Sequence, residues 1–94
     1  MTKRLRARIE RDFPPGSVQP VIERLEALDL GGADEPGVER IQAAVVLLAA
    51  GDWYAFERAA HDAVIDWRDV LCAAGLENED WPQRLEHALG PHLS

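Results

Sequence analysis

The chain has few of the side chains that carry covalent chemistry. Cys72 is the only cysteine among the 94 residues, and Ser17 and Ser94 are the only serines. A lone cysteine cannot form an intramolecular disulfide, which fits a reducing cytoplasm. We expect Ser17 to cap a helix, and Cys72, late in its helix, to be a small thiol that is buried or half-buried. Nucleophilic catalysis is therefore disfavoured.

Long apolar segments are also absent. The longest apolar run, Ala43–Ala50, is far shorter than a helix that spans a bilayer. Residues 1–13 carry charges throughout and lack the apolar segment of a signal peptide. Gly31-Gly32 follows an expected helix, whereas a phosphate-binding loop follows a strand. These absences predict a soluble, cytoplasmic protein with no membrane contact and no cofactor.

Charge is unevenly distributed along the chain. The net charge is −7, yet residues 1–12 hold five basic residues against two acids, and the remainder holds five arginines against fifteen acids. Such an acidic body repels nucleic acid and anionic membranes, so neither is the favoured partner. Arg4, Arg8 and Arg11 could still bind phosphate, or could dock on the acidic body of their own or a neighbouring chain.

The apolar residues recur at helical spacing, and no window alternates with the period of a strand. We therefore expect an all-α fold, an irregular or orthogonal bundle of five or six short helices. It forms one domain over 1–94, with 1–13 as a basic N-terminal helix that is loosely attached. The first expected helix, over 2–12, has Leu5, Ile9 and Phe13 at spacing four; the second runs from Ser17 to Gly31-Gly32 with Pro20 in the first turn, and the third covers 36–50 with Gly51 as its stop. A helix that contains Phe56, Ala60, Ala63 and Val64 starts at Asp52, the next runs from Asp66 to Gly75, and the last runs from Asp80 to Gly90.

Every tryptophan directly follows an aspartate. The pairs are Asp52-Trp53, Asp66-Trp67 and Asp80-Trp81, spaced 14 residues apart. Aspartate is a favoured N-cap, and an indole can begin an apolar face, so we expect helix starts with core or helix-junction tryptophans. Little else recurs, so the spacing indicates helices of similar length. No glycine or proline stops the helix before Asp66, where we expect a break or a kink.

The stretch from Glu39 to Leu85 resembles a family of short bacterial all-helical proteins of unknown function. The likeness lies in Glu39–Val45 and Gly51-Asp52, in Asp-Trp-Arg-Asp-Val-Leu at 66–71, and in Glu-Asp-Trp-Pro at 79–82. The resemblance implies a shared helical fold and a bacterial source. It brings no activity, ligand or catalytic residue.

The favoured function is a non-catalytic protein-interaction or accessory module that binds another protein, or itself as a homodimer. Tryptophan and arginine dominate many protein interfaces. Trp67, Arg68 and Asp69 are therefore the first candidates for partner binding, and Trp53 with Tyr54 is the second.

Two other hypotheses remain open. A small metal-binding protein or enzyme could use Glu57 with His61 and Asp62 with Asp66, since residues four apart share a helix face. His87 or His92 could complete such a Zn, Mn or Fe site, but no histidine or cysteine pair has a diagnostic spacing. We therefore assign no metal ligand and no catalytic residue. The third hypothesis is a nucleic-acid-linked regulator that acts through the basic N-terminal helix.

Overall fold

The computed structural model describes residues 1–30 and 35–90, and in these ranges the chain forms five helices and no strand. The helices are α1 (Lys3–Asp12), α2 (Pro15–Glu26), α3 (Glu35–Ala49), α4 (Trp53–Ala74) and α5 (Trp81–Leu89). The prediction of an all-α bundle is confirmed.

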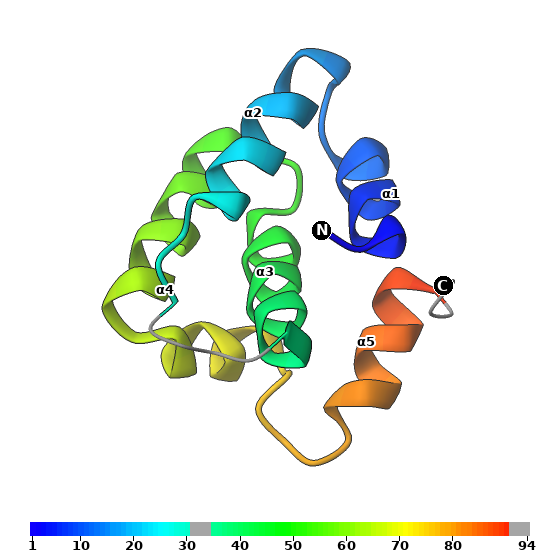
Figure 1. The fold of residues 1–94 in the computed structure, drawn as a ribbon, viewed down its shortest axis with the longest axis vertical. Helices are drawn as coiled ribbons and strands as arrows, with labels where there is room; N and C mark the ends of the chain where they lie inside the picture. The colour runs from blue at the N-terminus through cyan, green and yellow to red at the C-terminus, as the bar shows by residue number, and fades with distance from the viewer. Residues whose placement is uncertain (31–34, 91–94) are drawn as a thin grey trace.

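Helix α3 lies at the centre of the bundle, with the other helices arranged around it (Figure 1). Ile41, Val45 and Val46 are almost completely buried, and α4 is the most extensive neighbour of α3. From α4, Phe56 and Ala63 enter the same core. A helix that is apolar nearly all round its C-terminal half requires neighbours on several sides, which explains the central position of α3.

Helix α1 contributes directly to this core. Leu5, Ile9 and Phe13, spaced four apart in the sequence, are all buried. The Phe13 ring meets the Phe56 ring edge to face, with 5.8 Å between centroids. The apolar face of α1 therefore packs on the bundle, and its basic residues lie around that contact.

The boundaries of α2 differ from the prediction. The helix begins at Pro15, with Pro14 at the N-cap position, so Ser17 lies in the first turn and Pro20 lies inside the helix. Two consecutive prolines with φ already restricted start the helix early. The helix ends at Glu26, and Leu30 then turns into the core. The predicted stop, Gly31-Gly32, lies outside the described residues.

The predicted C-terminal ends of α4 and α5 are confirmed. Gly75 and Gly90 both have positive φ, and each follows the last residue of its helix. After α4, the Leu76 amide donates to the Leu71 carbonyl at 2.9 Å, the hydrogen bond of a Schellman motif. Leu76 is buried, so this turn carries the chain from α4 towards α5.

Candidate functional site

Helix α4 is interrupted at Asp66. This residue has extended backbone angles (φ −156°, ψ 96°) inside an otherwise helical segment. Its side-chain Oδ1 accepts a hydrogen bond from the Arg68 amide at 3.1 Å, as an N-cap residue does. The predicted break is confirmed, and α4 consists of two helical segments, residues 53–65 and 67–74.

The break redirects the chain beneath α3. In Figure 1, α4 descends along one side of α3 and turns at the lower left, where the ribbon passes from green to yellow. Val70 and Leu71 of the second segment are buried, as Ala59 and Ala60 of the first segment are. The kink therefore lets one continuous stretch of chain cover two sides of the central helix.

Two large apolar side chains remain exposed just before the kink. Val64 is 50% exposed and Ile65 is 69% exposed. Val64, one of the apolar residues expected in this helix, therefore does not join Ala60 and Ala63 in the core. Three consecutive apolar residues, Ala63, Val64 and Ile65, span about 200° of a helix, and only Ala63 points into the core.

Two open hollows flank Ile65 and Asp66. One has a volume of about 500 Å³ and is lined by Asp29 and Leu30 together with residues 64–68. The other, of about 370 Å³, runs from Asp62 along the second segment and includes Leu48 of α3. We call Asp62 and residues 64–69 the kink surface. It combines exposed apolar area with two concave sites.

The first candidates for partner binding all lie on the kink surface. Trp67 is half-buried and packs against the core, while Arg68 and Asp69 are exposed. The Arg68 guanidinium carbon lies 5.6 Å from the centre of the Trp67 ring, within reach of a cation–π contact. The kink surface also includes Asp62, Asp66 and Asp69, all exposed, so its carboxylates outnumber its one guanidinium.

The second candidates lie at the opposite end of the first α4 segment. Tyr54 is 81% exposed, and Trp53 is 36% exposed with its ring 5.4 Å from that of Phe56. Eleven residues separate Tyr54 from Ile65, so both project from nearly the same face of the helix, about 16 Å apart along its axis. The structure therefore does not bring the two candidate sets together, because the kink at Asp66 lies between them.

The three aspartate–tryptophan pairs have different environments. Asp52 caps α4 by accepting from the Ala55 amide at 3.4 Å. Asp80 stands at the N-cap position of α5 but makes no side-chain cap bond, so this part of the prediction is wrong. Its carboxylate instead accepts from Arg84 Nε at 2.8 Å. The exposed Arg84 side chain, one turn later, thus binds the Asp80 carboxylate in place of the backbone amides at the start of α5.

The last tryptophan, Trp81, is a helix-junction residue, as predicted. Its indole is half-buried against the core, and the Arg40 guanidinium carbon lies 4.8 Å from the ring centre. Arg40 Nε also donates to the Leu76 carbonyl at 2.7 Å. Arg40 therefore joins α3 to the loop before α5 and to the first turn of α5.

The metal hypothesis is not supported by the part of the chain that the structure describes. There, no three His, Cys, Asp or Glu side chains are grouped so that they could hold an ion. Glu57 instead lies 3.5 Å from Arg24 Nε as an ion pair between α4 and α2. His92, a possible additional ligand, lies outside the described residues.

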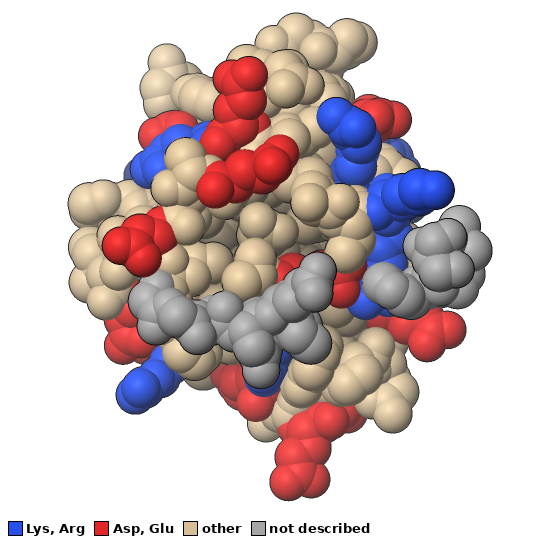
Figure 2. Space-filling view, in the orientation of Figure 1, with Lys and Arg blue, Asp and Glu red and all other residues tan. Residues whose placement is uncertain are grey.

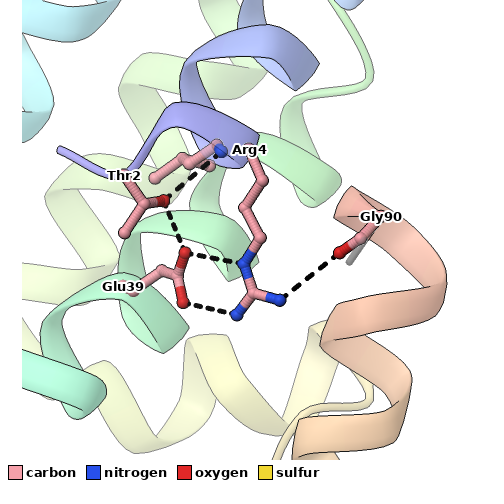
Figure 3. Close-up of polar contacts among 5 residues, drawn as sticks. Thr2, Arg4, Glu39 and Gly90 are labelled. Atoms are coloured by element: carbon pink, nitrogen blue, oxygen red, sulfur yellow. Dashed lines mark hydrogen bonds and ion pairs between the residues drawn. The ribbon is translucent and has the colours of Figure 1, made fainter. Parts of the chain in front are cut away.

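Two of the N-terminal arginines bind within the chain. Arg4 donates through Nε and Nη2 to Glu39 of α3, at 2.9 and 2.6 Å, and through Nη1 to the Gly90 carbonyl (Figure 3). The Thr2 hydroxyl also donates to Glu39. Hydrogen bonding to Glu39 raises the pKa of Arg4. This largely buried pair joins α1, α3 and the end of α5. Docking on the acidic body of its own chain was one of the expected alternatives for Arg4, but the sequence did not identify Glu39 as the partner.

Arg8 strengthens the same junction. It donates to Asp12 at 2.8 Å and to the Ala88 carbonyl at 2.7 Å. The last carbonyls of a helix lack partners within the helix, so arginines at that end satisfy them and complement the helix dipole. Lys3, Arg6 and Arg11 remain exposed. Figure 2 shows several basic side chains on the side of the molecule that holds α1, and others on the opposite side.

Cys72 is exposed, not buried or half-buried as predicted. Its pKa is raised, chiefly by a hydrogen bond to Glu77 and by the negative charge of that carboxylate. At neutral pH the thiol is therefore less ionised than an ordinary cysteine thiol. An activated nucleophile requires the opposite shift.

Comparison of the chain with protein-family models, with curated proteins and with solved structures gave no significant match. Within the described ranges, no helix combines the length and apolar character required to cross a bilayer. The kink surface is therefore characterised by its own geometry alone.

Proposed function

We propose that this protein is a non-catalytic interaction or accessory module that binds another protein through the kink surface. The observation that carries the proposal is the exposure of Val64 and Ile65 beside two hollows. Exposed apolar area beside concave sites is typical of a binding surface. Trp67 and Arg68, at the same place, belong to the residue types that dominate interface energetics.

The chemistry of the described residues favours binding over catalysis. The Cys72 thiol has a raised pKa, and Ser17 lies in the first turn of α2. Of the metal candidates, Glu57 is paired with Arg24. In keeping with the single cysteine and the family resemblance, we place the module in a bacterial cytoplasm.

A second candidate is a nucleic-acid-linked regulator, which the exposed Lys3, Arg6 and Arg11 favour. Two circumstances weaken it. Arg4 and Arg8 are engaged within the chain, and residues 13–94 carry ten more acids than bases. Repulsion from that acidic body opposes phosphate binding.

The proposal is tested with Ile65→Asp. The purified protein serves as bait in nuclease-treated lysate of its source, beside the control Ala7→Asp, which introduces the same charge at an exposed position of α1. Because Ile65 is exposed, the substitution should change the free energy of unfolding by at most about 0.5 kcal/mol. We expect wild type and Ala7→Asp to capture the same protein and Ile65→Asp to lose it.

Sedimentation of the purified proteins accompanies the capture experiment. A wild-type dimer that becomes monomeric in Ile65→Asp would show that the bound protein is a second copy. The proposal would be overturned if the wild-type protein stays monomeric and if every protein that it captures is also captured by Ile65→Asp. Treatment of the lysate with nuclease separates protein binding from bridging by nucleic acid through α1.

A further inference from the structure

We propose that the kink surface binds a basic amphipathic helix of the partner protein. This inference rests on the proposed function and specifies the chemistry of the partner. It is drawn from the charge around the two hollows, from the apolar residue between them, and from the helical geometry of the surface.

Charge complementarity is the first argument. The two hollows are lined by Asp29, Asp62, Asp66 and Asp69, whereas Arg68 is the one basic residue among their lining residues. Even without Asp29, three carboxylates against one guanidinium leave a negative site. Lysine or arginine side chains on a partner would be attracted to it, and an acidic partner would be repelled.

The apolar contacts determine how such a partner would be seated. Ile65 lines both hollows, and their volumes of about 500 and 370 Å³ fall within the usual range of ligand pockets, roughly 300–1,000 Å³. Apolar residues one helical turn apart on a partner could enter the two hollows on either side of Ile65. Helices commonly bind grooves through such i, i+3 and i+4 anchors.

A second copy of this chain is a poorer occupant of the surface. In a two-fold dimer the same patch faces itself, so one surface with an excess of carboxylates would face another with the same excess. Like charges that face each other repel. A β-strand partner would need an unpaired strand edge, and the described part of the chain contains no strand.

The test uses a synthetic 18-residue helix as the probe, with leucines at i, i+3, i+4 and i+7 and lysines elsewhere, together with a matched peptide in which glutamate replaces lysine. Calorimetric titration gives the dissociation constants. We expect the lysine peptide to bind one to one, and the glutamate peptide to bind at least tenfold more weakly. Ile65→Ser should weaken binding of the lysine peptide by roughly tenfold or more, because the isoleucine side chain is no longer there to be buried by the peptide.

The charge contribution is tested with the double variant Asp62→Asn/Asp69→Asn. Its matched control is Glu10→Gln/Glu79→Gln, which removes the same charge at exposed positions away from the kink surface. We expect a roughly threefold to tenfold loss of affinity in the first and less than twofold in the second, from surface pairs of typical strength. Thermal unfolding of each variant confirms that it is folded.

Three results would overturn the inference: no binding of the lysine peptide, equal losses in the two double variants, or unchanged binding by Ile65→Ser. Equal losses would mean general attraction to an acidic protein. If Ile65→Asp loses a captured partner but the Asp62→Asn/Asp69→Asn variant retains it, the partner is not basic and the proposed function stands. If capture and titration both fail, the proposed function fails as well.

Discussion

At the scale of single residues, the turn between α3 and α4 requires glycine at one position. Gly51 has φ +82°, and a Cβ atom placed there would lie 2.4 Å from the Asp12 carbonyl oxygen at the end of α1. The sequence predicted Gly51 only as a helix stop. The close approach of α1 makes glycine necessary for a second, tertiary reason.

Gly51→Ala should therefore be strongly destabilising. We expect the free energy of unfolding to fall by about 2 kcal/mol or more, from backbone strain and the contact with Asp12. The control is Gly16→Ala in α2, where a Cβ would meet nothing within 4 Å. Alanine at position 16 should raise the free energy of unfolding by about 0.5–1 kcal/mol. Urea unfolding measures both, and equal effects would contradict the assigned role of Gly51.

At the scale of helices, one dipeptide performs different tasks. Asp52 begins α4 and Asp66 begins its second segment, each through a side-chain hydrogen bond to a backbone amide. Asp80 begins α5 without such a bond and pairs with Arg84. Local propensity identifies a helix start, but the neighbours of the carboxylate decide which donor it binds.

Asp66→Ala and Asp80→Ala should consequently differ. Loss of the Asp66 cap should cost about 1 kcal/mol and speed hydrogen exchange of the amides after the kink. Loss of the exposed Asp80–Arg84 pair should cost at most about 0.5 kcal/mol. Asp66→Ser, which can still cap, should recover most of the stability. An Asp66→Ala protein as stable as wild type would show that packing alone maintains the kink.

At the scale of the whole molecule, the Arg4–Glu39 pair connects segments far apart in the sequence. Its two side chains are each 11% exposed, and Arg4 also reaches the carbonyl that ends α5. The pair raises the pKa of Arg4, so its contribution to stability is complete at neutral pH. The part of it that belongs to the Arg4 charge is lost as the pH rises through the raised pKa in strong alkali.

Replacing one member of the Arg4–Glu39 pair should lower the free energy of unfolding more than replacing both. Arg4→Met leaves Glu39 buried without its guanidinium, and we expect a loss of roughly 3 kcal/mol. The double variant Arg4→Met/Glu39→Leu should recover part of that loss, because no charge is then left unpaired. Thermal and urea unfolding at pH 7 measure the cycle. A double variant less stable than Arg4→Met would show that the pair stabilises the fold beyond neutralising its own charges.

Much of the site could be predicted from the sequence, but its decisive features could not. The run Asp66-Trp67-Arg68-Asp69 stood out because no residue before it stops a helix. The exposure of Val64 and Ile65 was missed, since a helix pattern shows which residues are apolar and not how much of the helix its neighbours cover. Leu30, which follows α2, and Leu48 of α3 line the hollows beside residues of α4, and no local sequence pattern reveals such contacts.

By itself, the sequence determined that the chain is all-α, that α1 buries Leu5, Ile9 and Phe13, that glycines end α4 and α5, and that α4 breaks at Asp66. These follow from apolar periodicity, capping and glycine conformation, which act over a few residues. Only the tertiary structure decided the start of α2, the partner of Asp80, the exposure of Cys72 and the burial of Arg4 with Glu39. Each depends on which distant groups arrive beside a side chain, and that is decided by packing of the whole bundle.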